Sequence, residues 1–307
     1  MKAAHKDRIV ELVPSGVIFD CTLDRYTSFA IGGPAAAVVR VNRTSDLQPL
    51  LTFFREQQLA WRVLGRGTNV LVRDEGFDGV VVLLGDGFRQ VCWTTDEHTG
   101  KTVVRAGGGL GLGNLSHLCA DRGLSGIEFC CGIPGTVGGA VVMNAGAWGG
   151  EISQVITEVE VVTADGVVVL GKDDLHFSYR SFPGFSRFQG HGIVSSAVFV
   201  LDLGDGEKIR QRCREVMEKR SQLQPTGYPN AGSFFKNPPG ESAGKLIDLC
   251  GLKGMKLGGA MVSSKHGNFL VNRDHATARD VLSLMRHIQQ KVREQHGINL
   301  EPEIHIL

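Results

Sequence analysis

The chain has 307 residues, with 33 basic and 32 acidic side chains, 41 glycines and only 10 prolines. This length allows two or three domains, and the balanced charge gives no electrostatic reason to expect nucleic acid or an anionic membrane as a partner. Glycine in excess without proline indicates many tight loops in a folded protein.

The N-terminal sequence and the cysteine spacing indicate where the protein is located and whether it binds a metal. No run approaches the ~18 apolar residues of a membrane-spanning helix, and the first residues, MKAAHKDRIVELVP, lack the apolar stretch of a signal peptide. The seven cysteines form no Cys-x-x-Cys pair, and the adjacent Cys130 and Cys131 suit neither an ordinary disulfide nor a zinc site. We therefore expect a cytoplasmic protein with reduced thiols and no metal.

Strand patterns dominate the first 200 residues. Alternating or continuous apolar runs predict these strands, and Ala164-Asp165-Gly166 between two of them predicts a hairpin. The predicted strands cover residues 36–41, 70–72, 79–84, 102–106, 155–163, 167–170 and 193–201.

Helix patterns dominate the last 100 residues. One earlier helix is expected to begin at Ser45, which forms a capping-box pattern with Gln48. The other predicted helices cover residues 114–122, 208–223, 241–250 and 277–296, the last with a buried stripe of Val281, Leu284, Ile288 and Val292. The fold class is therefore α+β.

Two glycine-rich segments carry the functional signal. Residues 126–149 contain seven glycines and one carboxylate, Glu128. A helix or strand is disfavoured there, because each glycine costs roughly 0.5–1 kcal/mol relative to alanine. Residues 65–69 form a second glycine loop between two apolar runs, which predicts strand–loop–strand. Backbone N–H groups in such loops bind anionic oxygens, so two loops suggest a long cofactor with a central diphosphate.

A Rossmann fold is the less favoured host for such a cofactor. No Gly-x-Gly-x-x-Gly fingerprint follows a predicted strand and opens a helix. Residues 107–111 come close to that fingerprint, but the residues from Leu112 onward make a poor phosphate-facing helix start.

Four segments occur in a recognisable order along the chain. They are YTSFAIGG at 26–33, GRGTNVLVRD at 65–74, the glycine-rich residues 126–149, and AGSFFKNP at 231–238, with Leu-Glu-Pro-Glu near the end. Over roughly residues 20 to 307 the chain resembles the UDP-N-acetylenolpyruvoylglucosamine reductases. The resemblance implies a flavoenzyme of bacterial peptidoglycan synthesis, in which NADPH, through non-covalent FAD, reduces UDP-N-acetylglucosamine enolpyruvate to UDP-N-acetylmuramate.

The resemblance also implies a domain organisation. It predicts an FAD-binding fold of the vanillyl-alcohol-oxidase type in two subdomains, followed by a substrate-binding α+β domain. The first subdomain would cover residues 1–84 with a return strand at 298–307, the second residues 85–221, and the substrate domain residues 222–297.

The cofactor-binding residues implied by the resemblance lie in the two glycine loops. The backbone near the glycines can donate N–H groups to the FAD diphosphate, and Thr68 and Asn69 add side-chain donors. The predicted set is Gly65, Arg66, Gly67, Thr68, Asn69, Gly132, Ile133, Pro134, Gly135, Gly138, Gly139, Ala140, Asn144 and Gly146.

Three positions match the catalytic pattern of the family. Arg180 would be the cation that binds the substrate carboxylate, Ser233 the proton donor to the α-carbon, and Glu303 the acid that polarises the carboxylate. In a strand Glu301 and Glu303 share a face, so spacing alone does not choose between them, and the motif assigns the role to Glu303.

The predicted substrate-binding residues are Tyr179, Lys236, Asn237 and His266. Tyr179 can equally pack beside the flavin, and His266 can equally be a hydrogen-bonded loop histidine. Where many relatives have a basic residue before the serine loop, this chain has Leu223, so a contact to the diphosphate is either absent or made by Lys236 or Arg220.

The interval from Arg180 to Ser233 is short. It leaves little room for the folded insertion with a tyrosine lid that one branch of the family carries. The chain therefore resembles the shorter branch, whose site must close in another way.

Two alternatives stay open at this point. One is a flavin oxidase of the same superfamily, which would use oxygen and often has FAD linked to a histidine or a cysteine; Cys130 and Cys131 lie near the expected cofactor loop. The other is a flavin- or nucleotide-binding protein without turnover. The partners expected for the reductase are the UDP-sugar and NADPH, with no nucleic acid and no membrane, and the protein is expected to be a monomer or weak oligomer.

Overall fold

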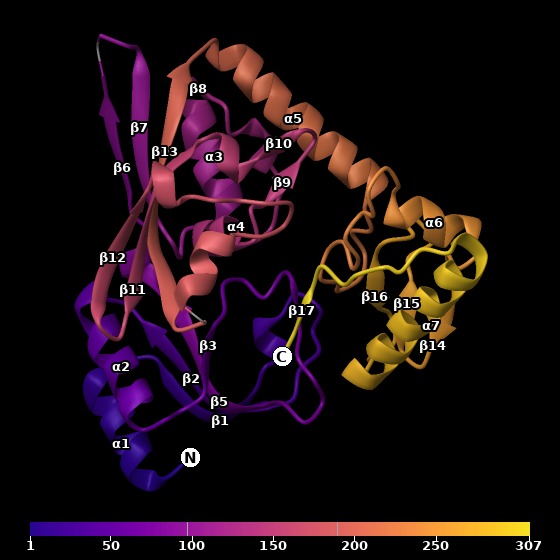
Figure 1. Ribbon diagram of the computed structural model, residues 1–307, viewed down its shortest axis with the longest axis horizontal. Helices are drawn as coiled ribbons and strands as arrows, with labels where there is room; N and C mark the ends of the chain where they lie inside the picture. Colours follow the sequence, from indigo (N-terminus) through magenta and orange to yellow (C-terminus); the bar gives the residue numbers. More distant parts are fainter. Residues whose placement is uncertain (97, 189) are drawn as a thin grey trace. The chain divides into compact units, whose positions relative to one another are not determined.

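The computed structural model describes residues 1–96, 98–188 and 190–307. The chain forms two compact units, each assembled from three separate stretches of sequence, so the indigo-to-purple part of Figure 1 contributes to both. Unit 1 comprises Met1–Phe19, Ala37–Gly65 and Gly79–Lys219, and unit 2 comprises Asp20–Ala36, Arg66–Asp78 and Arg220–Leu307.

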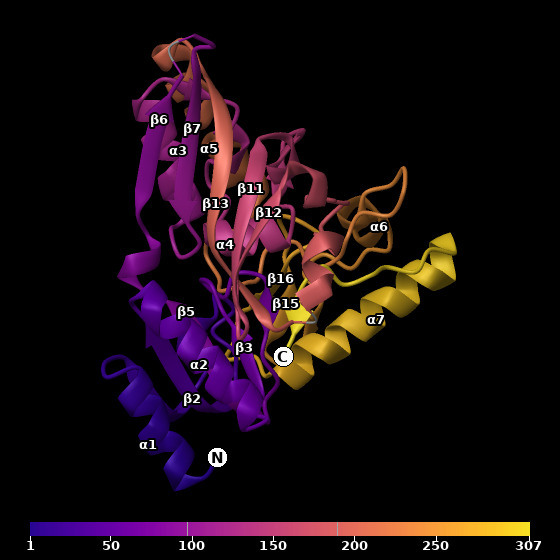
Figure 2. The same ribbon diagram turned by 60° about the vertical axis from the view of Figure 1, so that its left-hand side comes forward.

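The larger sheet of unit 1 is antiparallel, with the strand order β12-β11-β13-β7-β6 and β8 beside β13 (Figure 2). In its β11–β12 hairpin Thr163 pairs with Gly166, so Ala164 and Asp165 form the predicted turn. The strands are β6 (Val91–Thr95), β7 (Lys101–Gly107), β8 (Leu124–Ser125), β11 (Ile156–Thr163), β12 (Gly166–Gly171) and β13 (Gly192–Leu203).

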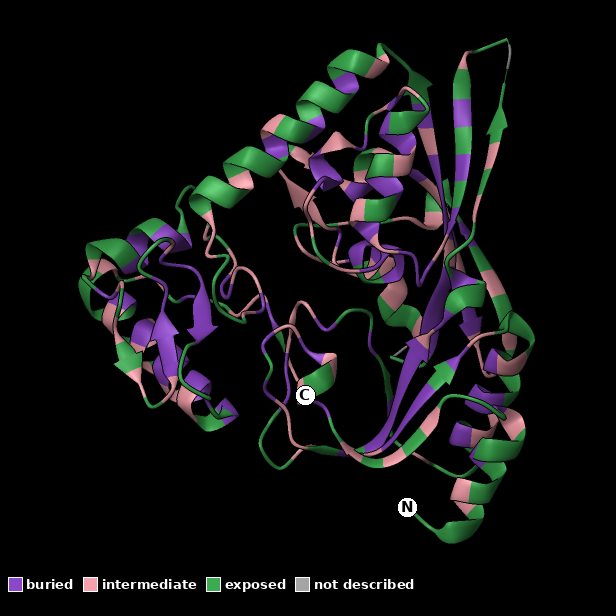
Figure 3. Ribbon diagram, turned by 180° about the vertical axis from the view of Figure 1, so that it is seen from behind, coloured by how far each residue is buried: buried purple, intermediate pink, exposed green. Residues whose placement is uncertain are grey.

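Three helices accompany this sheet in the sequence: α3 (Leu112–Asp121), α4 (Val137–Val142) and α5 (Gly206–Leu223). α4 packs on β13 and β7, and its fully buried Val141 joins the same core as Phe199 of β13. Most of β13 is buried, as the purple colour in Figure 3 shows, because it is a central strand with covered faces.

The second sheet has the order β1-β2-β5-β3, and α1 (Ala3–Leu12) and α2 (Thr44–Glu56) share a core with it. α2 contributes the fully buried Leu47, Leu50 and Phe54 to this core. The chain passes from one unit to the other within β1, β2 and β5. The strands are β1 (Val17–Thr22), β2 (Pro34–Val41), β3 (Trp61–Val63) and β5 (Phe77–Leu84).

Unit 2 combines a small antiparallel sheet with two helices. α7 (Ala278–His296) packs on the sheet β14-β15-β16 and on α6 (Ala243–Leu249), through the predicted buried stripe. β4 (Val70–Leu71) pairs in parallel with β17 (His305–Ile306), the last strand of the chain. The sheet strands are β14 (Lys256–Leu257), β15 (Ala260–Val262) and β16 (Leu270–Asn272).

Short elements complete the described chain. The hairpin β9–β10 follows the second glycine loop. The two strands and the 3₁₀ helices are β9 (Gly146–Ala147), β10 (Gly150–Glu151), η1 (Asp24–Tyr26), η2 (Asp86–Phe88), η3 (Glu128–Cys130), η4 (Ile152–Gln154), η5 (Lys172–Asp174) and η6 (Pro183–Phe188).

Every strand and helix predicted from the sequence is present, with bounds shifted by no more than two residues. The structure adds α1, β1, β3, β6, β8, β9, β10 and the short sheet β14–β16. In the last 100 residues the helices α5, α6 and α7 still contain far more residues than the strands, as predicted. Strands of two or three residues are too short to show alternation, and only their tertiary pairing reveals them.

Two local predictions are wrong. The capping box at Ser45 does not form, because α2 begins after Arg43 and the Ser45 hydroxyl contacts Asp46 Oδ1 at 3.1 Å. The glycine stretch 126–149 does contain a helix, α4. Thr136 caps it, and the buried Val137 and Val141 contribute apolar packing that offsets the cost of its glycines.

The predicted division into three domains stays a prediction. Residues 20–36 and 66–78, which that division assigns to FAD-binding subdomain 1, cluster with the C-terminal stretch in unit 2. The interval between Arg180 and Ser233 holds η6, β13 and α5 among its described residues.

Candidate active site

The first glycine loop, residues 65–69, connects β3 to β4. A Cβ on Gly65 would lie 2.7 Å from Thr136 Oγ1, so this residue packs against the second glycine loop. Gly67 has a φ of 62°, and a Cβ there would collide with the carbonyl oxygen of Tyr26. Only glycine fits at Gly67, and the exposed Arg66 lies between the two glycines.

The second glycine loop turns sharply before α4. Gly132 and Gly135 have φ values of 77° and 134°, on either side of Ile133 and Pro134. Positive φ favours glycine, and the proline fixes its own φ, so these four residues form a rigid turn. Thr136 follows and caps α4 by accepting a hydrogen bond from the Gly139 N–H at 3.3 Å.

The N–H groups predicted to donate to a diphosphate have other acceptors in this loop. The Gly138 N–H donates to the Gly108 carbonyl at 2.9 Å, the Gly139 N–H to Thr136, and the Ala140 N–H to the Thr136 carbonyl at 2.8 Å. In this conformation Gly138 contributes a close backbone approach, because a Cβ there would lie 3.1 Å from Gly108 O.

Asn144 links the glycine loop to the turn that carries Arg180. Its side chain is fully buried and its φ is 40°. Its Oδ1 accepts the Ser153 N–H at 3.0 Å, and its Nδ2 donates to the Ser178 carbonyl at 3.1 Å. We predicted Asn144 as a cofactor residue, and the structure gives its side chain this bridging role between backbone segments.

The turn at residues 178–181 presents Tyr179 and Arg180 at its tip. Ser178 and Ser181 pair with each other through two backbone hydrogen bonds of 3.0 and 3.1 Å. Arg180 has a φ of 55°, which is rare for a residue with a side chain. Its Nη2 donates to the Gly146 carbonyl at 2.9 Å, and its guanidinium carbon lies 4.9 Å from the Tyr179 ring centroid. Backbone strain of this kind is common at functional sites.

In unit 2 the segment after Ser233 pairs with the C-terminal segment that contains Glu303. The Glu303 N–H donates to the Phe234 carbonyl and the Lys236 N–H to the Glu301 carbonyl, both at 2.9 Å. Phe235 and Pro302 form an antiparallel bridge between the same segments. The segment that follows Ser233 therefore lies against the segment that ends in Glu303.

The two candidate carboxylates of this C-terminal segment have different surroundings. Glu301 is 76% exposed and lies 3.6 Å from Lys236 Nζ, whereas Glu303 is half-buried. Asn69 Nδ2 donates to the Glu303 carbonyl at 3.1 Å, so the first glycine loop reaches this residue within unit 2. Arg180 belongs to unit 1, and Ser233 and Glu303 belong to unit 2.

The predicted substrate residues Asn237 and His266 both make internal contacts. Asn237 Oδ1 accepts the Ala243 N–H at 3.0 Å, at the start of α6. His266 Nδ1 accepts the Asn268 N–H at 3.1 Å. Burial, with a smaller effect of Lys253, lowers the pKa of His266, so its ring is neutral at pH 7.

Sequence reasoning missed two buried asparagines, Asn268 and Asn272. Both occur in the apolar segment GNFLVN, and a polar amide in an apolar run was the available signal. Asn272 Nδ2 donates to the Phe29 carbonyl at 3.1 Å, and its Oδ1 accepts the Ala276 N–H at 2.8 Å.

Comparison with known proteins identifies the family. Residues 224–307 match the UDP-N-acetylenolpyruvoylglucosamine reductase C-terminal domain, and residues 35–171 match an FAD binding domain family. The chain is 41% identical over 303 residues to the UDP-N-acetylenolpyruvoylglucosamine reductase of Syntrophus aciditrophicus, covering 98% of this chain and 95% of that protein. The chain belongs to the UDP-N-acetylenolpyruvoylglucosamine reductase family.

Further relatives support the same family. The second reductase of Symbiobacterium thermophilum is 44% identical over 286 residues, covering 92% of this chain and 90% of that protein. The crystal structure of the reductase from Thermus caldophilus superposes with a TM-score of 0.76 at 38% identity, covering 94% of this chain and 97% of that one. The predicted family and its FAD-binding fold are thereby confirmed.

The cysteines near the second glycine loop do not favour the tethered-flavin alternative for this family member. Cys130 and Cys131 are fully buried, and burial raises the pKa of the Cys130 thiol well above its ordinary value. Cys131 Sγ lies 3.4 Å from Ser116 Oγ inside unit 1. Within the described residues no His, Cys, Asp and Glu side chains gather into a metal-binding group, and no helix is long and apolar enough to cross a membrane.

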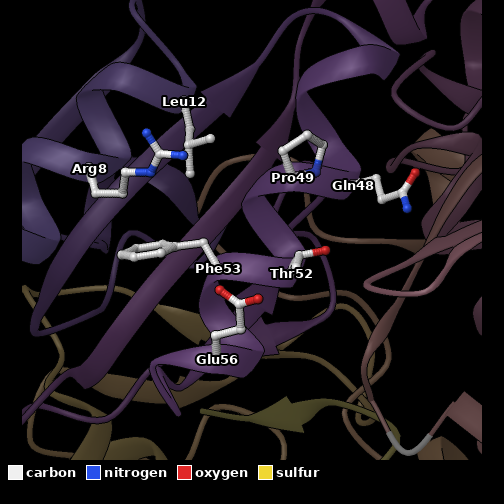
Figure 4. Close-up of a pocket in the computed structure, with 7 residues that line it drawn as sticks. All are labelled: Arg8, Leu12, Gln48, Pro49, Thr52, Phe53 and Glu56. Carbon is white, nitrogen blue, oxygen red and sulfur yellow. The ribbon is translucent and has the colours of Figure 1, made fainter.

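A surface hollow of unit 1 is lined by residues of α1 and α2. Figure 4 shows it between α1, which contributes Arg8 and Leu12, and α2, which contributes Gln48 and Phe53. None of the predicted site residues lines it.

Proposed function

We propose that this chain reduces the enolpyruvyl group of UDP-N-acetylglucosamine enolpyruvate to give UDP-N-acetylmuramate, with NADPH as reductant and FAD as cofactor. This is a step of bacterial peptidoglycan precursor synthesis. The observation that supports the proposal is the antiparallel pairing of residues 234–236 with 301–303, which joins the segment that follows Ser233 to the segment that ends in Glu303.

In our proposal the two glycine loops hold the cofactor. Cβ atoms would meet Thr136 at Gly65 and Tyr26 at Gly67, so the loops are shaped for close approach of backbone rather than of side chains. When bound, FAD supplies hydride that originates from NADPH. In our proposal the backbone of residues 65–69 and of the turn 132–135 binds its diphosphate region. Gly138, Gly139 and Ala140, whose N–H groups donate within the protein, contribute close backbone approach, and Gly146 and Asn144 support the loop.

Arg180 holds the substrate carboxylate in this proposal. Hydride addition at the β-carbon of the enol ether puts negative charge on the α-carbon and its carboxylate. A planar guanidinium offers two parallel donors to that carboxylate. The turn at residues 178–181 and the Gly146 carbonyl fix the direction of the Arg180 side chain in advance, which reduces the entropy lost when the substrate binds.

Ser233 and Glu303 complete the chemistry. The Ser233 hydroxyl donates the proton that the α-carbon needs, and Glu303, when protonated, donates a hydrogen bond to the carboxylate. Lys236 and Asn237 are the proposed contacts to the nucleotide diphosphate or uracil, and Tyr179 and His266 are further proposed substrate residues. A neutral His266 would bind by hydrogen bonding rather than by charge.

The remaining features of the proposal concern partners and location. NADPH and the UDP-sugar are the proposed ligands, and neither nucleic acid nor a membrane is a proposed partner. We infer a cytoplasmic protein that is a monomer or weak oligomer.

The test follows the visible flavin absorbance of the purified holoenzyme without oxygen. NADPH should bleach the flavin, and addition of UDP-N-acetylglucosamine enolpyruvate should restore the colour with formation of UDP-N-acetylmuramate. Ser233→Ala should leave bleaching by NADPH within about 3-fold of wild type and slow the recovery by about 10²–10⁴-fold, the usual contribution of general acid catalysis. Recovery by oxygen but not by the sugar nucleotide would instead identify an oxidase.

A further inference from the structure

The four residues from Ser233 to Lys236 are held from two sides in unit 2. On one side they pair with the C-terminal segment, because the Phe234 carbonyl accepts the Glu303 N–H and Phe235 bridges to Pro302. On the other side the partner is a single residue, Asn268, which lies in the loop that precedes β16.

Asn268 binds this segment with both its backbone and its side chain. Its carbonyl accepts the Phe234 N–H at 2.8 Å. Its Oδ1 accepts the Phe235 N–H at 2.9 Å, and its Nδ2 donates to the Phe235 carbonyl at 2.7 Å. The side-chain amide therefore reproduces the two hydrogen bonds that a neighbouring strand would make.

Asn268 is itself held rigidly. Its side chain is 3% exposed, and its backbone N–H donates to His266 Nδ1 at 3.1 Å. A buried amide with directed donor and acceptor partners has one orientation, and rotation by half a turn would place donor against donor and acceptor against acceptor. Phe235 is thus fixed in direction as well as in position.

We propose that Asn268 is a positioning residue for Ser233. The amide touches neither the serine hydroxyl nor any reacting atom on the proposed pathway. It fixes the backbone at Phe234 and Phe235, next to Ser233, and so leaves the serine hydroxyl only its own side-chain rotation. Displacement of a reacting group by about 1 Å can cost about 10²-fold in rate. The inference rests on the proposed function, because only proton transfer from Ser233 makes this placement matter.

Asn268→Ala and Asn272→Ala form the test pair, both prepared as FAD-loaded full-length protein. Each removes one buried amide that joins backbone groups in unit 2, but Asn272 binds Phe29 and Ala276 rather than the Ser233 segment. We expect Asn268→Ala to slow flavin reoxidation by the sugar nucleotide by about 10–100-fold and to leave reduction by NADPH within about 3-fold. Asn272→Ala should lower thermal stability without changing the ratio of the two rates.

A double variant separates positioning from general loosening. When Asn268→Ala is added to Ser233→Ala, the further loss in the reoxidation rate should be under about 3-fold, because the group being positioned is already gone. If Asn268→Ala does not retain flavin, Asn268→Ser is assayed in the same way with the same expectation.

A readout without turnover uses amide hydrogen exchange of the flavin-free protein. The Phe235 N–H should lose protection in Asn268→Ala and keep it in Asn272→Ala. Equal losses in both half-reactions, an undiminished loss in the Ser233→Ala background, or unchanged exchange at Phe235 would each overturn the inference. If the wild-type flavin is bleached by NADPH but not reoxidised by the sugar nucleotide, the proposed function itself fails, whatever the variants do.

Discussion

Glu301 and Glu303 lie two residues apart, and the structure gives them different surroundings. Glu301 is largely exposed and lies near Lys236, whereas Glu303 is half-buried and joined through its backbone to Phe234. An acid that stabilises charge only in the transition state lowers kcat when removed, with little change in KM. We therefore expect Glu303→Gln to lower kcat by about 10²-fold or more, at a KM within about 3-fold of wild type.

Glu301→Gln is the matched control for this pair. It removes the same charge from the same tail, two residues away, and its weak surface pairing with Lys236 is worth about 0–1 kcal/mol. Steady-state kinetics of the two variants should therefore differ strongly. A larger fall in kcat for Glu301→Gln than for Glu303→Gln would mean that Glu301, and not Glu303, is the acid.

His266 makes a prediction about pH. Burial lowers its pKa from the ordinary 6.5, so the folded ring stays neutral while the unfolded chain takes up a proton below that pH. The unfolded state then binds more protons, and this part of the stability is present above the unfolded pKa and is lost as pH falls. The free energy of unfolding of wild type minus that of His266→Gln should decrease as pH is lowered through 6.5.

Urea unfolding of both proteins across that pH range is the measurement. A difference between wild type and His266→Gln that stays constant with pH would mean that the ring does not change protonation on unfolding. In that case the hydrogen bond between His266 and Asn268 would contribute the same stability at every pH.

At the scale of elements, helix starts show what sequence could and could not provide. Ser45 with Gln48 and Thr277 with Asp280 both have the residue types of a cap, but only the second pair forms one. Thr277 Oγ1 accepts the Asp280 N–H at 3.1 Å, and Asp280 Oδ2 accepts the Thr277 N–H at 3.0 Å. The first residue of a helix depends on the path of the preceding chain in the tertiary structure, which the local sequence does not determine.

This contrast predicts unequal costs for two similar substitutions. Thr277→Ala should destabilise the protein by about 0.5–2 kcal/mol, the usual loss on removing an N-cap side chain. Ser45→Ala, in the first turn of α2 with only a contact to Asp46, should change stability by less than about 0.5 kcal/mol. Chemical denaturation of both variants decides the matter, and equal effects would show that the hydroxyl at Thr277 does not act as a cap.

The glycine loops show the same limit of sequence reasoning. Their positions could be predicted, because glycine at such density has few other uses. The helix α4 could not, since it depends on the burial of Val137 and Val141 in a core made largely by β13 and other distant segments. The contact of Asn268 with Phe235 could not be predicted either, because the two residues are 33 positions apart in the chain.

At the scale of the whole molecule, the unexpected feature is the assembly of unit 2 from three distant stretches. Periodicity identifies elements but says little about partners, so the pairing of β4 with β17 could not be predicted from two-residue strands. This pairing joins the last residues of the chain to the segment that follows the first glycine loop. The His305 N–H donates to the Asn69 carbonyl at 3.0 Å, and the Leu307 N–H donates to the Leu71 carbonyl at 2.9 Å. The Arg73 N–H donates to the Leu307 carbonyl at 2.8 Å.

Removal of residues 305–307 should therefore destabilise unit 2 far from the cut. At least these three backbone hydrogen bonds disappear, at a net value of about 1 kcal/mol each, and the first glycine loop loses its anchor at Asn69. We expect a lower melting temperature, faster amide exchange at residues 70–73 and weaker FAD retention. His305→Ala is the control, because it keeps the backbone bonds and should preserve all three properties. If the two proteins lost FAD equally, the His305 side chain rather than the strand pairing would support the cofactor loop.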